Sequence, residues 1–485
     1  MMKPTRALLA AAILAAAAPS PAAVPTSPAS NGNHQRLIVL TDIEADPDDT
    51  ESLVRLMLYS NQVDIEGLVA TTSVHMKSGL HADSIRRVVE AYGRVRGNLL
   101  LHEPGFPTSD ALLGMIRDGQ PIYGMAAVGA GKDTPGSDRI VTMLKAPDSR
   151  PLWVTIWGGA NTLAQALYRI RESETPAEAD RLLAKLRVYT ISDQDDSGAW
   201  IRKTFPSLFY IVSPGGYGGA TWTAINTVID GLDNRTIGND WLRANIQQGH
   251  GPLGAAYPDV SYGMEGDTPS WLSLIPNGLG DPEHPEWGGW GGRYELYVPS
   301  LANMDVEGFT GGVPIEAETR PIWTNAIDTY SPSVSGDYGR AHVPAQHSFK
   351  DFRTTLWRWR DDFQNDFAAR MAWSTLPYAK ANHPPVPRLA TSDHLTVHSG
   401  EVFVLSALGS SDPDGDSLSY LWFQYTEAGS LRAQVPALIA ENIYRVSYRA
   451  PVVTKPETVH FILKVTDKGN PPLSRYRRVI VTILP

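Results

Sequence analysis

The stretch Arg36–Thr50, RLIVLTDIEADPDDT, decides the fold of this chain. Its first part, Leu37 to Thr41, is almost entirely apolar or β-branched and predicts a buried strand. Pro47 then stands at the first turn of a predicted helix with the sequence ESLVRLMLYS. The turn between them lies at the edge where an open parallel sheet binds ligands. It carries five acidic residues: Asp42, Glu44, Asp46, Asp48 and Asp49.

This concentration of negative charge indicates a cation site. Neighbouring carboxylates repel one another unless a positive charge neutralises them, and oxygen ligands suit Ca²⁺ or Mg²⁺. The alternative is an acidic helix cap, in which Asp48 and Asp49 complement the helix dipole. Because a cap needs one or two acids rather than five, the sequence favours the cation site.

The acidic turn also resembles a known family signature. Asp42-x-Glu44-x-x-x-Asp48-Asp49 is similar to the D-x-D-x-x-x-D-D motif of the nucleoside hydrolases, in which Ca²⁺ binds the attacking water and the sugar diol. The resemblance implies that all four acids are metal ligands and that Glu44 is also the general base. Glutamate at position 44, where the family has aspartate, moves the carboxylate outward and disfavours the ordinary nucleoside substrate.

Two later turns are similar to other parts of that family's calcium site. In the turn Gly158–Leu163, Asn161 takes the position whose backbone carbonyl binds calcium, although a helix cap is the alternative there. In SYGMEGDTP, Asp267 matches the last ligand, with an ordinary turn residue as the alternative. Gly266 replaces the histidine that is the leaving-group acid in some members, so Glu265 is the nearest catalytic substitute.

Several polar and aromatic residues are candidates for binding the substrate. The turn SDQDDSG supplies Asp193, Gln194, Asp195 and Asp196, which are equally explained as a helix-cap cluster. The aromatic-rich segment 271–297 supplies Trp287, Trp290 and Arg293 as a predicted substrate wall, or else folds as a compact loop on its own aromatics. His75 follows the second predicted strand, where a loop histidine is most often solvated.

The remaining pattern predicts two domains. Strands over 65–72, 152–157, 187–192 and 208–213 alternate with helices over 84–95 and 163–169, which indicates a mostly parallel α/β sheet flanked by helices over residues 35–380. Aromatic spacing predicts a long helix over 349–373. A Pro-rich linker, 381–388, leads to short strands over 395–397, 402–405, 418–423, 459–466 and 478–484. These indicate an immunoglobulin-like sandwich over 389–485. Its Asp-rich turn, 411–416, is either a bare turn or a Ca²⁺ ligand.

Composition narrows the class of protein. The chain has 485 residues, no cysteine and a net charge of -10, so disulfides, thiolate chemistry and a basic surface for nucleic acid are excluded. Residues 1–24 read as a signal peptide, with basic Lys3 and Arg6 before an apolar run too short to span a bilayer. We therefore expect a secreted or periplasmic protein without a stable membrane anchor. The oligomeric state stays open.

Together these features lead to a functional prediction. The chain resembles a secreted, nucleoside-hydrolase-like branch that carries an immunoglobulin-like domain and is described as cellulose-binding. The resemblance implies a calcium-dependent, glycoside-cleaving hydrolase acting on a sugar derived from a polysaccharide or oligosaccharide, by attack of calcium-bound water at the anomeric carbon. The alternatives are a non-catalytic carbohydrate-binding protein and a nucleoside N-ribohydrolase.

Overall fold

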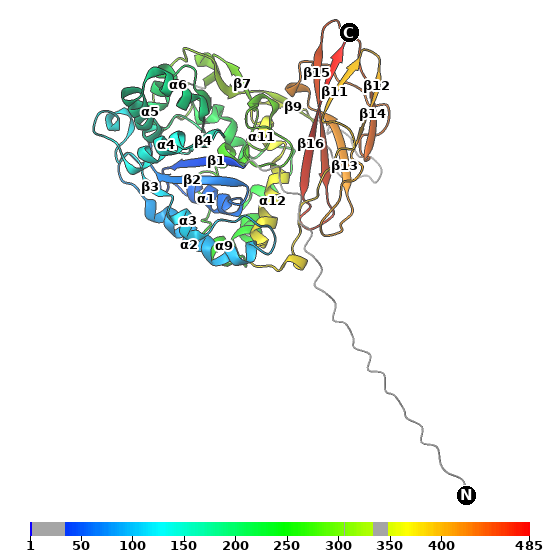
Figure 1. Cartoon of the computed structure of the whole chain (residues 1–485), viewed down its shortest axis with the longest axis horizontal. Coiled ribbons are helices and arrows are strands. Elements are labelled where there is room, and N and C mark those ends of the chain that lie inside the picture. Colours follow the sequence, from blue (N-terminus) through cyan, green and yellow to red (C-terminus); the bar gives the residue numbers. More distant parts are fainter. Residues whose placement is uncertain (2–33, 305, 333–347) are drawn as a thin grey trace.

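The structure is a computed structural model that describes residue 1 and residues 34–304, 306–332 and 348–485. It confirms the predicted fold class, a mostly parallel α/β sheet flanked by helices followed by a β-rich C-terminal domain (Figure 1). The predicted signal peptide falls outside the residues described. Among those described, no helix combines the length and the apolar character needed to cross a bilayer.

The central sheet has eight strands in the order β3-β2-β1-β4-β5-β6-β8-β7. Neighbouring strands are parallel except for β7 and β8. Strand β1 lies between β2 and β4. The next two strands in the sequence, β2 and β3, extend the sheet on one side of β1, and the later strands extend it on the other side. In such sheets a ligand crevice forms at this switch point. The strands are β1 Gln35–Thr41, β2 Val63–Ala70, β3 Ile116–Asp118, β4 Leu152–Ile156, β5 Leu186–Thr190, β6 Phe209–Val212, β7 Tyr294–Tyr297 and β8 Ile322–Asn325.

Helices cover both faces of this sheet because its strands are apolar on both sides. In β1, Leu37 and Val39 join one hydrophobic core, and Ile38 and Leu40 join the other. Helices α1 Asp48–Leu58, α2 Ala82–Leu99 and α12 Arg360–Ala372 pack on the first side. Helices α4 Pro135–Lys145, α5 Asn161–Ser173, α6 Pro176–Lys185 and α7 Ser197–Thr204 pack on the second. The shorter helices are α3 Ser109–Leu113, α8 Asn239–Leu242, α9 Gly251–Ala255, α10 Pro269–Leu272 and α11 Thr354–Trp357.

The C-terminal domain has a separate core between two sheets, in which Trp422 and Phe461 are completely buried. One sheet has the order β11-β16-β15-β13, and the other pairs β12 with β14. The five predicted strands are confirmed, and β14 is additional. The bounds predicted for the domains and for the linker stay predictions. The strands are β11 His394–His398, β12 Val402–Ser406, β13 Ser419–Gln424, β14 Arg445–Arg449, β15 Glu457–Thr466 and β16 Ser474–Leu484.

The prediction of one helix over 349–373 is wrong. Its first residues form strand β10 Phe349–Asp351, which pairs with β9 Asp328–Tyr330. The chain then turns, since Asp351 Oδ1 accepts a hydrogen bond of 2.8 Å from the backbone N–H of Arg353. Only α11 and α12 are helical. Pairing with a segment distant in the sequence therefore overrides the local helical pattern.

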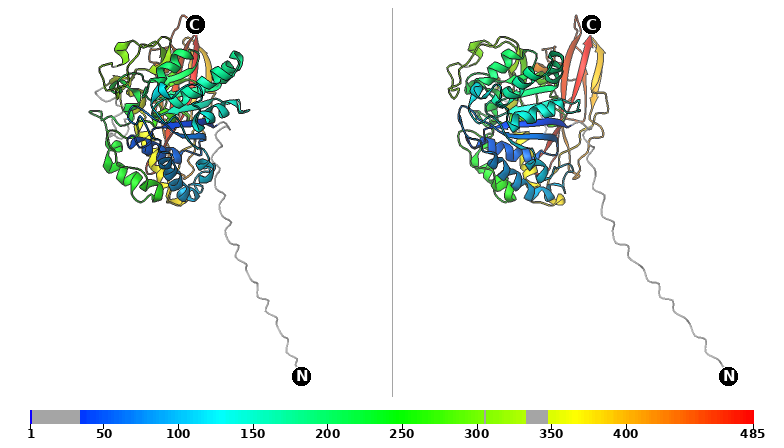
Figure 2. Two further views of the ribbon diagram at one scale, coloured as in Figure 1. Left: turned by 90° about the vertical axis from the view of Figure 1, so that its left-hand side faces the viewer. Right: turned by 60° about the vertical axis from the view of Figure 1, so that its left-hand side comes forward.

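Helix α12 lies at the interface between the two domains (Figures 1 and 2). Its Asp362 accepts hydrogen bonds from Lys464 at 2.6 Å and from Ser474 at 3.1 Å, and also from the Tyr476 hydroxyl. On the next turn, Asp366 forms an ion pair of 2.7 Å with Arg475. Because both carboxylates are buried and each has partners in the C-terminal domain, we infer that the two domains form one unit.

A buried histidine gives this interface a dependence on pH. His460 is 4% exposed, and its Nδ1 accepts a hydrogen bond of 3.0 Å from Arg478. Burial, followed by the charge of Arg478, lowers the pKa of His460 to about 3. The unfolded chain therefore binds a proton at this position at a higher pH than the folded chain does. We expect stability to fall as pH drops below about 6.5 towards 3.

The His460→Gln variant should lose part of this acid sensitivity, because glutamine still accepts a hydrogen bond from Arg478 but does not titrate. Thermal unfolding of both proteins between about pH 7 and pH 4 measures the difference. His398→Gln is the matched control, since His398 is exposed. An unchanged acid sensitivity in His460→Gln would contradict the assignment.

Candidate functional site

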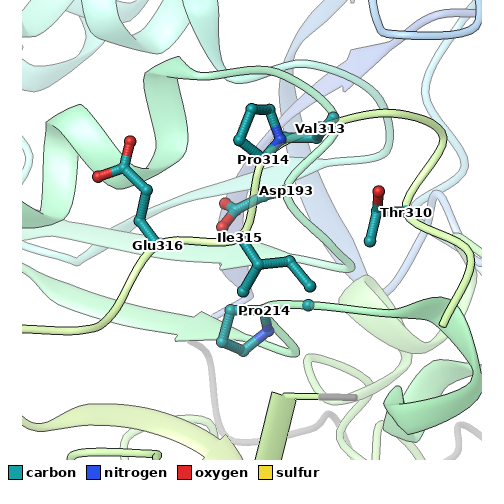
Figure 3. A pocket seen from close by; sticks show the side chains of 8 residues that line it. Asp193, Pro214, Thr310, Val313, Pro314, Ile315 and Glu316 are labelled. Atoms are coloured by element: carbon teal, nitrogen blue, oxygen red, sulfur yellow. The ribbon is translucent and has the colours of Figure 1, made fainter. Parts of the chain in front are cut away.

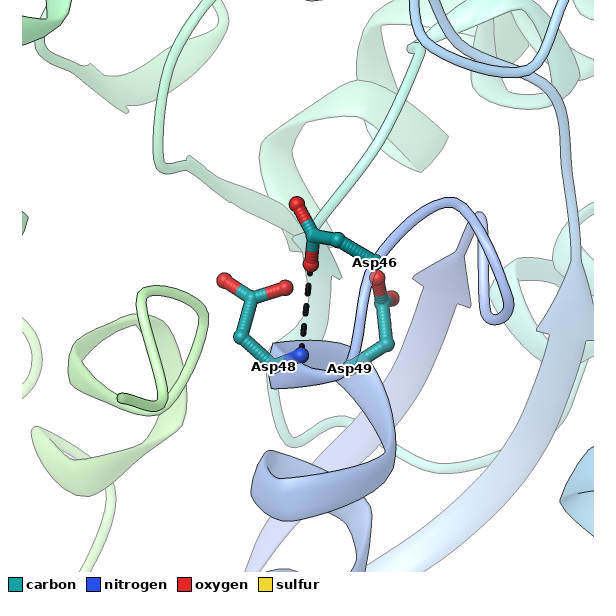
Figure 4. A group of neighbouring side chains, drawn as sticks. All are labelled: Asp46, Asp48 and Asp49. Atoms are coloured by element: carbon teal, nitrogen blue, oxygen red, sulfur yellow. Dashed lines mark hydrogen bonds between the residues drawn. The ribbon is translucent and has the colours of Figure 1, made fainter. Parts of the chain in front are cut away.

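The acidic turn lies at the carboxyl end of β1 and continues into the first turn of α1. Carboxylate oxygens of Asp46, Asp48 and Asp49 lie within 4.8 Å of one another (Figure 4). Asp46 Oδ1 accepts a hydrogen bond of 3.2 Å from the backbone N–H of Asp48, which fixes the turn. No side chain caps α1, whose N-cap residue is Pro47. Asp48 and Asp49 do lie in the first turn of α1, as the helix-cap alternative expects, so the choice between cap and cation site depends on the residues around this turn.

Two further aspartates face the same point. Asp42 is 3% exposed, and a Cβ at Gly158 would overlap its carboxylate, so only glycine permits this approach. Asp267 is 2% exposed, and its Oδ2 has no hydrogen-bond partner. We use the name acidic site for the five side chains that converge here: Asp42, Asp46, Asp48, Asp49 and Asp267.

The electrostatics of the acidic site favour a bound cation. Burial raises the pKa of Asp42 to about 6. Burial, reinforced by the neighbouring carboxylates, holds the pKa of Asp48, Asp49 and Asp267 well above the ordinary range. Buried carboxylates without a positive partner are costly. An all-oxygen donor set with one unsatisfied oxygen fits a hard divalent cation such as Ca²⁺.

Glu44 does not join the acidic site. Its backbone adopts a left-handed φ of 81°, and its side chain runs to α2, where it accepts a hydrogen bond of 2.7 Å from Arg87 and another from Ser84. The carboxylate is 43% exposed. Asp46, which the family signature did not assign as a ligand, lies in the cluster instead. In the sequence, Asp46 was indicated only as one of the five acidic residues of the turn.

Glu265 is a structural residue. It is completely buried, and Arg55 forms an ion pair of 2.6 Å with it. Tyr257 and Thr268 donate hydrogen bonds of 2.8 and 2.9 Å to its two oxygens. Both carboxylate oxygens of Glu265 therefore have partners in the interior of the protein. The structure does not present this carboxylate to a leaving group.

Asn161 begins α5 and is completely buried. Its side chain accepts a hydrogen bond from Thr71 at 3.0 Å and donates one to Thr72 at 2.9 Å, so it ties the end of β2 to α5. The backbone N–H of Asn161 donates to Asp195 at 3.1 Å. Asn161 is not the N-cap residue, which is Ala160. Its predicted role as a carbonyl ligand stays a prediction.

The three predicted aspartates after β5 have different environments. Asp195 is 1% exposed, and burial raises its pKa to about 6. Asp196 precedes α7 and accepts a hydrogen bond of 2.8 Å from the backbone N–H of Met125. Asp193 pairs with Arg202 at 2.7 Å and lines a small hollow beside Pro214 and the segment 313–316 (Figure 3). Asp193 therefore borders a small hollow.

The predicted substrate wall, Trp287, Trp290 and Arg293, lies away from the acidic site. Trp290 and Arg293 are each 1% exposed. Trp290 packs edge-on against Tyr476 of the C-terminal domain, and Arg293 pairs with Asp328 at 2.7 Å. Trp287 lies at a cavity between the domains. These side chains stabilise or border the domain interface because this segment packs against β16, and they do not line the acidic site.

A different set of aromatic rings borders the acidic site. The Tyr217 ring lies 5.6 Å from Trp222 and 5.3 Å from Phe309, and its hydroxyl lies 3.0 Å from His75 Nε2. Burial and the negative charges of the acidic site raise the pKa of Tyr217. A Cβ at Gly266 would lie 2.8 Å from Asp48 Oδ2 and 2.9 Å from Trp222, so this indole reaches the cluster. We call Tyr217, Trp222, Phe309 and His75 the aromatic rim.

The sequence did not predict that the residues of the aromatic rim form one group. Tyr217 and Trp222 follow β6 at the same sheet edge as the acidic turn, which was an available signal. Phe309 comes from a later loop and is 67% exposed, and no local pattern marked it. Tyr217 and Trp222 combine an apolar ring with a polar group, which suits a surface that contacts a partly polar ligand.

Comparisons with known proteins agree with this architecture. Residues 36–294 match the family described as "Cellulose-binding Sde182, nucleoside hydrolase-like domain", and residues 402–483 match "Cellulose-binding protein Sde0182, C-terminal domain". A solved structure of a nucleoside hydrolase-related hypothetical protein from Saccharophagus degradans, described as associated with carbohydrate metabolism, is 34% identical. Its alignment has a TM-score of 0.76 and covers 93% of this chain and all of that one.

More distant structures add no further information. The effector protein XOO4466 is 13% identical, with a TM-score of 0.27, over 60% of this chain and 87% of its own. The type III effector XopQ, complexed with adenosine diphosphate ribose, is 14% identical, with a TM-score of 0.26, over 72% of this chain and 94% of its own. Both scores are too low to relate the folds. No curated protein sequence matches the chain.

Proposed function

Because the chain belongs to the family of the nucleoside-hydrolase-like, cellulose-binding Sde182 proteins, we propose that it hydrolyses a glycosidic bond in a sugar derived from a polysaccharide or oligosaccharide. The reaction takes place at the acidic site, with Ca²⁺ as its cation, after export from the cytoplasm. The observation that carries this proposal is the convergence of five aspartates, with the unpartnered Asp267 Oδ2 among them.

In this proposal, the burial of each aspartate decides whether it binds the cation or acts as the general base. The buried Asp42, Asp49 and Asp267, together with Asp48, supply oxygen ligands. A cation held there would lower the pKa of a bound water and offset part of the negative charge of the carboxylates. Asp46 is half-buried, and the Asp48 N–H orients its carboxylate, so Asp46 is the base that accepts a proton from water. In this proposal Asp46 takes the role that the family signature implied for Glu44.

The aromatic rim binds the sugar next to these groups. Its rings offer apolar surface for the faces of a sugar, while the Tyr217 hydroxyl and His75 offer hydrogen bonds to its hydroxyl groups. The negative acidic site stabilises the positive charge that develops on the anomeric carbon in the transition state.

A non-catalytic carbohydrate-binding protein is the second candidate. It is favoured by two observations: Glu44 is held by Arg87, and Glu265 is held in the interior by Arg55. Neither carboxylate that the sequence suggested for catalysis reaches the acidic site in this structure. In a binding protein, the cation and the aromatic rim would organise a sugar site without turnover.

The test is calcium-dependent product release from a panel of polysaccharide-derived oligosaccharides and free nucleosides. We expect the Asp46→Asn variant to lose about 10²-fold or more of the rate, which is the usual contribution of a general base. Glu44→Gln removes a carboxylate from the same turn and is the matched control, which we expect to retain most of the activity. Addition of a chelator should stop the wild-type enzyme.

Each other outcome has a defined meaning. An equal loss of rate in Glu44→Gln would indicate that Glu44, and not Asp46, is the general base. Binding of the oligosaccharides by the wild-type protein without any release would overturn the hydrolase and support the binding protein. Cleavage of nucleosides alone would support the N-ribohydrolase.

A further inference from the structure

A second cavity lies between the two domains, away from the acidic site. It has a volume of about 210 Å³. Residues 278–281 and Trp287 of the α/β domain form one wall, and Asp393 with residues of β11 and β16 forms the other. Cavities at domain interfaces are preferred places for small ligands.

The walls of this cavity are firmly held. Arg478 of β16 donates hydrogen bonds of 2.6 Å to the Leu279 carbonyl and 2.9 Å to the Trp287 carbonyl. The backbone N–H of Tyr476 donates to Asn277 at 3.0 Å. The two walls are therefore tied together by hydrogen bonds from the C-terminal domain, and the cavity is preformed rather than dependent on a moving loop.

An indole side chain is fixed at this cavity. Trp287 stacks on His284 with 4.1 Å between ring centroids, and His460 contacts it edge-on at 5.2 Å. The guanidinium of Arg478 lies 5.6 Å from the indole centroid. Trp287 belongs to none of the three hydrophobic cores formed by the described residues. A tryptophan that is held rigidly at a cavity, outside a core, provides an ordered aromatic surface for a ligand.

The charged groups of the cavity balance one another. Asp281 and Asp393 supply two carboxylates, and Arg477 and Arg478 supply two positive charges. His394 adds a side chain that is 71% exposed. Since the charges sum to zero with a neutral histidine, the cavity does not select an anion such as a phosphate. Carboxylates that accept and a guanidinium that donates together match the hydroxyl groups of a neutral sugar.

We propose that this interdomain cavity is a second carbohydrate-binding site that takes one neutral sugar ring. Its volume lies below the roughly 300–1,000 Å³ of sites for drug-sized ligands, so a single ring fits better than a longer piece of chain. The inference rests on the proposed function only in taking a carbohydrate as the ligand. It requires neither calcium nor catalysis.

The two sites together suit a polymeric ligand. A sugar chain anchored at the interdomain cavity stays attached to the protein while another part of the chain, or a neighbouring chain, enters the acidic site. Such a second point of attachment raises the effective concentration of substrate without changing the chemistry.

The experiment is calorimetric binding of cello-oligosaccharides to the full chain in the presence of a chelator. We expect the wild-type protein to bind, and the Asp393→Ala and Arg477→Ala variants to bind at least about tenfold more weakly. Both side chains are exposed, so neither change removes core packing. Arg445→Ala removes another exposed arginine of the same domain and should bind like the wild type. Asp267→Asn, which alters only the acidic site, should also leave this binding unchanged.

Three outcomes would overturn the second site: no binding in the presence of chelator, normal binding by both Asp393→Ala and Arg477→Ala, or complete loss of binding in Asp267→Asn. Product release measured in parallel with calcium keeps the two proposals separate. A protein that releases sugar but does not bind in chelator retains the proposed function and lacks the second site.

Discussion

The Asp267→Asn variant is expected to melt at a higher temperature than the wild-type protein in the presence of chelator, and to lose the stabilisation that calcium gives to the wild type. Asp267 is 2% exposed, and the other four aspartates of the acidic site face it. Asparagine cannot ionise, so the repulsion that raises the pKa of Asp267 is absent in the variant, and the new amide donates to a neighbouring carboxylate. The same change removes a ligand charge and weakens calcium binding.

The measurement is thermal unfolding across a calcium titration. A ligand at 100 times its dissociation constant stabilises the folded state by about 2.7 kcal/mol, and we expect this gain in the wild type only. Asp83→Asn is the matched control, because it makes the same charge change at a side chain that is 89% exposed. A lower melting temperature in chelator together with a full calcium response would refute the placement of Asp267 in the cation site.

Arg55→Met is expected to lower the free energy of unfolding of the α/β domain by about 3–5 kcal/mol, the usual cost of removing one partner of a buried ion pair. Arg55 and Glu265 are both completely buried. The guanidinium also lies 4.0 Å from the centroid of the Phe367 ring. Burial and the nearby Glu265 raise the pKa of Glu51 to about 9, and Arg55 is a positive partner for both carboxylates of this group.

The double variant Arg55→Met with Glu265→Gln separates charge from packing. Glutamine keeps an acceptor for Tyr257 or Thr268 and carries no charge, so we expect it to restore part of the lost stability. Chemical denaturation of the three proteins, followed at the transition of the α/β domain, gives the comparison. A single variant that loses less than about 1 kcal/mol, or a double variant no better than the single, would contradict the role of the ion pair.

This ion pair also bears on the acidic site. Glu265 precedes Asp267 by two residues, and its backbone N–H donates a hydrogen bond of 2.9 Å to Glu51 of α1. Helix α1 also carries Asp48 and Asp49. The buried pair therefore fixes the distance between the two segments that supply the acidic site.

The fold was largely predictable because its signals are local. Alternation of apolar strands with amphipathic helices indicated the parallel sheet, and short strands after the Pro-rich segment indicated the β-rich domain. The failure at 349–373 had a non-local cause, since pairing of β10 with β9 is not visible in the helical spacing of that segment. The missed strand β14 has the same cause, because its pairing with β12 spans about forty residues.

The sequence by itself determined that a dense group of carboxylates follows a buried strand at the edge of a parallel sheet, because both features are contained in fifteen consecutive residues. Only the tertiary structure decided which carboxylates converge. Asp46 and Asp267 point into the site, Glu44 turns to Arg87, and Glu265 is neutralised by an arginine 210 residues away. Spacing along the chain cannot show these choices, because the backbone conformation of each turn and the ion-pair partner of each buried charge depend on segments brought together by folding.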